Sequence, residues 1–190
     1  MPPQFKALQH IALKVRDIEK SMHFYVDVLG FRVIERHGSY EKPDYPHSLN
    51  FLTCTNLHHV INLVSLAPES RPEKDGGPVV TRSVTDYGPH HFAFQVEDKA
   101  AFDAWESHLR KNGVEIVSGP VVHSPTYPGG DGLWGENRAM YFPDPDGHTI
   151  EIFCDMAELD PDGQINKEWQ RARIAGDGLD PAEVAHPRVG

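Results

Sequence analysis

The stretch His10-Ile-Ala-Leu-Lys-Val-Arg-Asp17 has a second version later in the chain, His91-Phe-Ala-Phe-Gln-Val-Glu-Asp98. In both stretches a histidine precedes alternating apolar residues, which is typical of a half-buried strand, and the closing Asp is a residue type that often begins a helix. An internal repeat decides the fold, because each copy then supplies one part of a larger structure. The sequence therefore predicts a duplication with a histidine at the same structural position in each copy.

The segments that follow the two stretches also match. Residues 18–29 and 101–112 carry apolar side chains at nearly helical spacing, and a glycine that suits a helix end follows each of them, Gly30 and Gly113. We expect three more strands in each copy, at 31–34, 48–54 and 59–66 in the first and at 114–117, 138–142 and 149–154 in the second. This order predicts an α+β fold made of two βαβββ modules.

The last predicted strands align His59-Val-Ile-Asn62 with His148-Thr-Ile-Glu151, so Asn62 and Glu151 occupy equivalent positions. After Cys154 only residues 164–174 form a helix candidate, which we expect to pack over the second module or over a neighbouring subunit of a homo-oligomer. The expected organisation is one domain in four segments: a first module (7–66), a Pro/Gly-rich linker (67–86), a second module (87–154) and a C-terminal extension (155–190).

Composition narrows the class of protein. The chain has 190 residues and a net charge of -10, from 18 basic and 28 acidic residues, so nucleic acid and anionic membranes are not expected partners. No apolar run approaches the roughly 20 residues of a membrane span, and the first residues lack a signal-peptide core. Cys54 and Cys154 are expected to be small buried hydrophobic residues in a reducing compartment, which favours a cytoplasmic protein.

Four side chains could share one cleft if the modules face each other around a pseudo-twofold axis: His10, Asn62, His91 and Glu151. Two imidazoles and one carboxylate are the facial triad of mononuclear non-haem Fe(II), which leaves positions open for substrate and oxygen. Asn62 carries a neutral amide, a poor metal ligand, so the set stays at three. The alternative interpretation is that the histidines are structural and that Glu151 faces solvent, although an inward carboxylate would need a partner.

The chain resembles the vicinal oxygen chelate superfamily, which includes glyoxalase I, methylmalonyl-CoA epimerase, fosfomycin resistance proteins and type I extradiol dioxygenases. The similarity extends over roughly residues 7–154. The motifs that carry it are His10-Ile-Ala-Leu13, Phe24-Tyr-Val-Asp-Val-Leu-Gly-Phe31, His91-Phe-Ala-Phe94 and Pro145-Asp-Gly-His-Thr-Ile-Glu-Ile152.

Within this superfamily the chain is most similar to extradiol ring-cleaving dioxygenases. That resemblance implies metal ligands at His10, His91 and Glu151. It also implies that His59 is the second-sphere histidine that handles a proton and that Tyr141 hydrogen-bonds the substrate oxygen. The further active-site histidine of the family has no clear counterpart, since Gly132 stands near its position.

The resemblance implies an Fe(II)-dependent dioxygenase that cuts a catecholic aromatic ring with O2, and Mn(II) fits the same ligand set. Two alternatives stay open. A glyoxalase-like lyase or an epimerase would need a fourth protein ligand and no oxygen, and a metal-free small-molecule binding protein would need none of the three ligands.

A long loop is predicted over residues 119–135, because it is rich in proline and glycine. Loops of this length are often lids or binding loops. It could present His123, Tyr127 or Trp134 to an aromatic substrate, or it could be a solvated connector.

Overall fold

The computed structural model describes residues 9–37, 47–66, 90–132, 136–162 and 164–181, so the predicted linker and Trp134 lie outside the described residues. The chain divides into two compact units. The first comprises Met1–Asp86 with Asp144–His148, and the second comprises Tyr87–Pro143 with Thr149–Gly190. The short segment Asp144–His148, predicted as part of the second module, thus belongs to the first unit.

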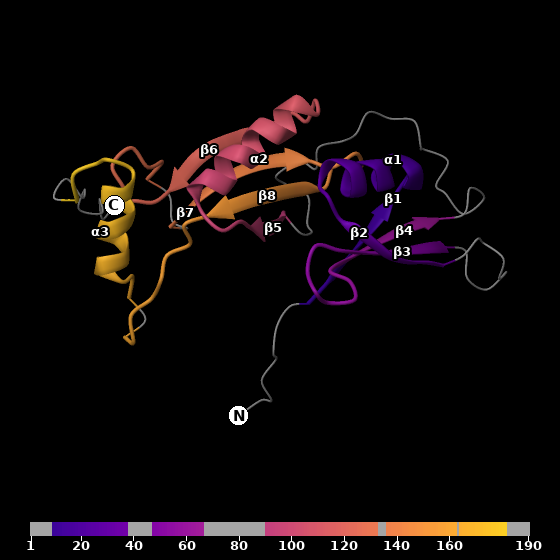
Figure 1. The fold of residues 1–190 in the computed structure, drawn as a ribbon, viewed down its shortest axis with the longest axis horizontal. Helices are drawn as coiled ribbons and strands as arrows, with labels where there is room; N and C mark the ends of the chain where they lie inside the picture. The colour runs from indigo at the N-terminus through magenta and orange to yellow at the C-terminus, as the bar shows by residue number, and fades with distance from the viewer. Residues whose placement is uncertain (1–8, 38–46, 67–89, 133–135, 163, 182–190) are drawn as a thin grey trace. The chain divides into compact units, whose positions relative to one another are not determined.

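The first unit contains a four-stranded sheet (Figure 1). Its strands are β1 (Ile11–Val15), β2 (Arg32–His37), β3 (His47–Thr53) and β4 (Ile61–Leu66). The order across the sheet is β1-β4-β3-β2, in which β1 and β4 are parallel and the other pairs are antiparallel.

The second unit repeats this sheet with the order β5-β8-β7-β6. Its strands are β5 (Phe92–Gln95), β6 (Ser118–His123), β7 (Asn137–Pro143) and β8 (Thr149–Cys154). The first and last strands are again parallel and the other pairs antiparallel. The two βαβββ modules predicted from the repeat are therefore confirmed.

The strand registers show that the repeat is accurate to single residues. Asn62 of β4 pairs with Ala12 and Phe51 on its two sides. Glu151 of β8 pairs in the same way with Ala93 and Tyr141. Asn62 and Glu151 are therefore equivalent, as predicted, and each module carries its histidine two residues before the paired alanine.

Each module has its helix between its first two strands. In the first unit α1 (Ile18–Met22) continues into one wide turn of π-helix, η1 (His23–Val28), and in the second unit α2 (Lys99–Lys111) lies across one face of the sheet (Figure 1). The carboxylates of Asp17 and Asp98 accept hydrogen bonds from the first backbone N–H groups of these helices, as the repeat predicts.

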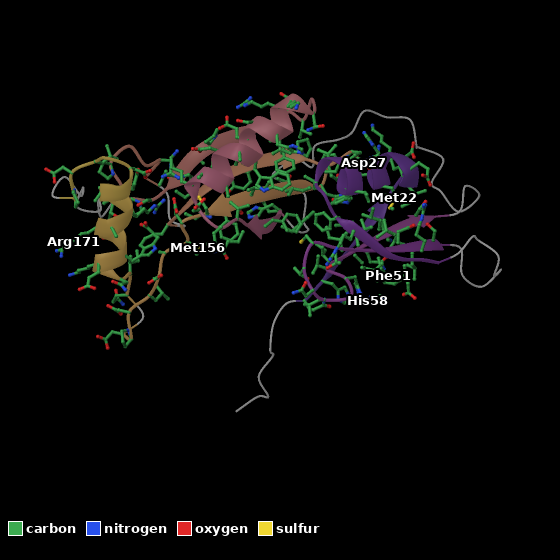
Figure 2. All side chains as sticks on the ribbon, in the orientation of Figure 1. Met22, Asp27, Phe51, His58, Met156 and Arg171 are labelled. Carbon is green, nitrogen blue, oxygen red and sulfur yellow. The ribbon has the colours of Figure 1, made fainter. Side chains whose placement is uncertain are left out.

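The core of the second unit lies between α2 and one face of its sheet. Alternation along β8 puts Ile150 and Ile152 on that face and Glu151 on the opposite one. The fully buried apolar side chains of this core are Phe102, Leu109, Met140, Phe142, Ile150 and Cys154. In the first unit Met22 is buried and Asp27 is exposed, so the helical segment there also turns an apolar side inward (Figure 2).

The predictions between residues 114 and 135 were partly wrong. Residues 114–117 are not a strand, because Val114 is used in ending α2: its N–H donates to the carbonyl of Leu109. The strand begins at Ser118, so the first residues of the predicted long loop form β6 at the edge of the sheet, where proline is tolerated. A bulge at the start of β6 needs glycine, since a Cβ on Gly119 would lie 2.6 Å from the carbonyl oxygen of Ala139.

The C-terminal helix α3 (Lys167–Gly176) belongs to the second unit. Arg138 of β7 forms an ion pair with Asp177, the residue that ends α3, and its Nη2 lies 2.6 Å from Oδ2. Arg138 also forms an ion pair with Asp155. Cys154 is buried as expected, but Cys54 is exposed, which corrects the prediction for that residue. Across the described residues, no helix is both long enough and apolar enough to cross a membrane.

Candidate metal and substrate site

A buried carboxylate and a histidine meet on the polar face of the second sheet. Glu151 is 5% exposed although it faces away from the α2 core. Its Oε2 lies 2.9 Å from Nε2 of His91, which comes from the residue just before β5. The parallel pairing of β5 with β8 positions the two side chains, because Ala93 is the direct partner of Glu151 and His91 lies two residues earlier on the same face.

Both members of this pair are held by further side chains. Nδ2 of Asn137 donates to Oε1 of Glu151 at 3.1 Å, which leaves Oε2 turned toward His91. Nδ1 of His91 lies 2.8 Å from Nδ1 of His90. The rings of these two neighbouring histidines therefore lie together, with centroids 5.1 Å apart.

The pair fits a divalent metal ion. Two ligand atoms bound side by side at about 2.1 Å from one ion lie roughly 3 Å apart, which matches the separation of the His91 nitrogen and the Glu151 oxygen. Metal-binding histidines usually have their second nitrogen held by another group, as His90 holds that of His91. Imidazole and carboxylate donors together suit Fe(II) and Mn(II).

Tyr141 lies beside this pair. It is the direct cross-strand partner of Glu151, and its ring centroid is 5.4 Å from that of His91. Burial raises the pKa of Tyr141 to about 12, and the charge of Glu151 and a hydrogen bond to it act in the same direction. The hydroxyl therefore stays protonated over the physiological range and can donate or accept a hydrogen bond.

The histidines of the first unit form a cluster of their own. The ring of His10 lies 4.7 Å from that of His59, and the ring of Phe51 lies 4.8 Å from His59 on another side. His58 joins this group, with its Nδ1 3.0 Å from Nδ1 of His59 (Figure 2 labels His58 and Phe51). The predicted residues His10 and His59 are thus brought together.

Burial lowers the pKa of His59, and the neighbouring charges of His10 and His58 lower it further. A neutral imidazole at this position can accept a proton. Nδ1 of His10 contacts Oε1 of Gln9 at 2.7 Å. The residue that precedes each repeated histidine, Gln9 or His90, thus contacts its Nδ1 and leaves Nε2 as the nitrogen suited to a metal.

Asn62, at the position equivalent to Glu151, has a buried Oδ1 without a hydrogen-bond partner among the described residues. Within that same part of the chain, no three or more His, Cys, Asp or Glu side chains lie close enough together to hold a metal ion. His10 belongs to the first unit and the pair of His91 and Glu151 to the second. The participation of His10 as a third ligand stays a prediction.

Sequence reasoning missed the residues that support the pair and Tyr141. Asn137 gives no local signal, because only the pairing of β7 with β8 brings it to Glu151. His123 was assigned to a loop that could meet an aromatic ring, and the structure places its Nε2 2.9 Å from the Tyr141 hydroxyl. This contact joins residues 18 positions apart in the sequence, and the pairing of β6 with β7 brings them together.

Known proteins place the chain in a family. The family model of the glyoxalase/bleomycin resistance protein/dioxygenase superfamily matches residues 7–152. The chain is 29% identical to Glyoxylase I 4 of Arabidopsis thaliana over 91% of its own length and 86% of that protein. It is 26% identical to the metallothiol transferase FosB of Staphylococcus saprophyticus, over 77% of this chain and 76% of that one.

A catechol-2,3-dioxygenase of Bacillus subtilis is 27% identical over 85% of this chain, which spans only 43% of that longer protein. Among solved structures, a glyoxylase/bleomycin resistance protein/dioxygenase domain from Frankia sp. EAN1pec has the same fold, with a TM-score of 0.58 at 20% identity, covering 80% of this chain and 99% of that one. The repeated βαβββ modules and the matched family model together show that the chain belongs to the glyoxalase/bleomycin resistance protein/dioxygenase superfamily, the vicinal oxygen chelate fold.

Proposed function

We propose that this protein is an Fe(II)-dependent extradiol dioxygenase that cleaves the ring of a catecholic substrate with O2. The observation that carries the proposal is the contact between His91 and Glu151, whose donor atoms lie 2.9 Å apart on a polar sheet face beside a tyrosine. The relationship to a catechol-2,3-dioxygenase supports this reaction. Mn(II) suits the same donors.

The ligand set in this proposal is His91, Glu151 and His10. His10 is the counterpart of His91 in the repeat, and its Nδ1 is engaged by Gln9 as that of His91 is by His90. Three protein ligands leave coordination positions for a diol and for oxygen, and the bound ion would supply the Lewis acidity and the redox chemistry of the reaction.

The remaining residues handle the substrate and its protons. Tyr141 positions a substrate oxygen, because its hydroxyl lies next to Glu151 and cannot ionise at neutral pH. His59 accepts a proton from the diol, and its low pKa keeps the imidazole neutral and ready for this role. The ring of Phe51 meets that of His59 in a T-shaped contact and offers an apolar surface to an aromatic substrate.

A second candidate is a metal-dependent lyase or epimerase. Asn62 favours it, since its unpaired Oδ1 occupies the position at which the second module carries a metal-binding carboxylate. The similarity to Glyoxylase I 4 extends over 91% of this chain. This candidate requires a metal but no oxygen.

The deciding experiment purifies the protein without oxygen, counts bound iron and manganese, and mixes it with a panel of catechols. A yellow ring-fission product that forms only with Fe(II) and O2 is expected, and it should disappear in Glu151→Gln. The matched control is Glu106→Gln, which alters a partly exposed carboxylate on α2. Metal binding without turnover of any diol would favour the lyase or epimerase, and an absence of metal binding would favour a metal-free binding protein.

A further inference from the structure

Three side chains form a continuous line that ends at Tyr141. Oδ2 of Asp131 lies 2.6 Å from Nδ1 of His123, and Nε2 of the same imidazole lies 2.9 Å from the hydroxyl oxygen of Tyr141. The side chains of Asp131 and His123 are both 20% exposed, so the line is largely shielded from water. It runs along the polar sheet face that carries Glu151 and His91.

The backbone fixes this line. His123 is the last residue of β6 and pairs with Asn137, on the same face as Tyr141. The chain then folds back on the strand it has just left, because the N–H of Asp131 donates to the carbonyl of Val122 at 3.0 Å. This return needs glycine at 130, where a Cβ would lie 2.6 Å from the carbonyl oxygen of Ser124. Asp131 is thus brought beside His123.

The shorter of the two distances indicates where one hydrogen lies. An imidazole nitrogen 2.6 Å from a carboxylate oxygen must carry the proton between them, so Nδ1 of His123 is protonated. In the neutral ring Nε2 then has a lone pair and accepts the hydrogen of the Tyr141 hydroxyl. The carboxylate-imidazole-hydroxyl order is the one by which hydrolases fix a histidine tautomer.

Glu151 is the competing acceptor for the Tyr141 hydrogen. Its two oxygens already face Nδ2 of Asn137 and Nε2 of His91. His123 has no such second partner on Nε2 among the contacts that the described residues make with it, other than Tyr141 itself. We place the hydrogen on the side of His123, because donation to Glu151 would instead require a hydrogen on Nε2 of His123 and hence a doubly protonated ring.

We propose that Asp131 and His123 are positioning residues that make the Tyr141 oxygen an acceptor, so that it receives a hydrogen bond from a hydroxyl group of the substrate. The inference rests on the proposed function for the place of the substrate. It deepens that function by naming the class of ligand: a hydroxylated molecule such as a diol is bound at this point in preference to a carbonyl compound, which offers no hydrogen. Phe51, which has no hydroxyl, holds the equivalent position in the first unit, so among the described residues this arrangement is found in the second unit.

The positions of the hydrogens on His123 can be tested by nuclear magnetic resonance of the imidazole nitrogens. The measurement uses the full chain at neutral pH without metal. The His123 signals are identified by their loss in His123→Gln. Protonation at Nδ1 alone is expected, and a tautomer protonated at Nε2 or a doubly protonated ring would overturn the proposal. In Asp131→Ala the Nδ1 preference should be lost, and its full retention would equally overturn the proposal. This result does not depend on metal or turnover, so it can fail while the proposed function stands.

The preference for a hydroxylated ligand can be tested by measuring how tightly catechol and 2-methoxyphenol bind to the Fe(II)-loaded protein under anaerobic conditions. His123→Phe should weaken catechol binding about three- to tenfold, the effect of one lost hydrogen bond, and leave 2-methoxyphenol, which lacks one hydroxyl, nearly unchanged. Equal weakening of both ligands would mean a general packing defect and would overturn the proposal. The matched control is His23→Gln, which removes an exposed His–Asp pair of 2.7 Å and should change neither ligand.

Discussion

Nε2 of His91 and Oε2 of Glu151 lie 2.9 Å apart on the polar face of the second sheet. A buried carboxylate is costly unless a positive charge or a hydrogen-bond donor compensates it, and the imidazole of His91 and the amide of Asn137 do so here. The same two atoms are the ones that an octahedral ion would hold in adjacent positions. This pair is thus the place among the described residues where we expect a metal ion to bind.

Replacing either member of this pair should abolish tight metal binding. His91→Ala removes a nitrogen ligand and Glu151→Gln removes the anionic one, so we expect the affinity for Fe(II) or Mn(II) to fall at least 100-fold, about 2.7 kcal/mol or more. Metal content after anaerobic loading and dialysis measures this. His108→Ala, an exposed histidine on α2, serves as the control. A Glu151→Gln protein that kept its full metal content would contradict the ligand assignment.

If the proposed ligands His10, His91 and Glu151 bind one ion, Asn62→Glu should add a fourth ligand to them. The new carboxylate would stand at the register position equivalent to Glu151. We expect tighter binding of divalent metal and slower oxygen-dependent turnover, because one open coordination position is filled. Titration with Mn(II) and oxygen uptake test the two effects, and Asn62→Gln is the neutral control. An unchanged metal affinity would show that position 62 does not face the ion.

The acidic side of the pH profile of kcat/KM should reflect the protonation of His59. The pKa of His59 is lowered, by burial first and then by the charges of His10 and His58. The imidazole therefore becomes protonated at a lower pH than an ordinary histidine, whose pKa is about 6.5. We therefore expect kcat/KM to fall only below about pH 6.5 and this limb to vanish in His59→Gln. His58→Gln removes one neighbouring charge, so the limb should move upward. A profile unaffected by His59→Gln would exclude His59 as the base.

Tyr25→Phe should destabilise the first unit. The Tyr25 hydroxyl donates to Oδ2 of the buried Asp144 at 2.9 Å, and losing a hydrogen bond to a charged group costs about 1.5–3 kcal/mol of unfolding free energy. Urea unfolding at pH 7 measures the loss. Tyr127→Phe, which removes a less buried hydroxyl that donates to Asp177, should cost less.

The same tyrosine should make the protein sensitive to alkali. Its pKa is raised by burial and by the charge and hydrogen bond of Asp144. The phenol titrates near pH 10 in the unfolded chain, so its stabilising contribution is complete below that pH and is lost as the pH rises through the higher value of the folded state. Unfolding free energies measured between pH 9 and 11 should fall more steeply for the wild type than for Tyr25→Phe. Parallel curves would contradict this.

Local sequence was sufficient for the modules and for part of the site. The helices follow from residues that act within a few positions, such as Asp17 and Asp98 at their starts, and Gly113, whose φ of 72° ends α2. The equivalence of Asn62 and Glu151 also followed, because strand alternation carries a repeated pattern through to the same register. These features depend on residues that are close together in the sequence. They can therefore be predicted without knowing which strands pair.

What the sequence determined by itself is the duplicated βαβββ order and the face on which Glu151 lies, since backbone periodicity fixes both. Only the tertiary structure decided where β6 begins, that Cys54 is exposed, and that Asp131, His123 and Tyr141 form one line. The first physical reason is that the limits of the edge strand β6 are set by its hydrogen bonds to β7. The second is that the chain reverses at Gly130, which brings Asp131 beside side chains of β6 and β7. No local pattern encodes those contacts.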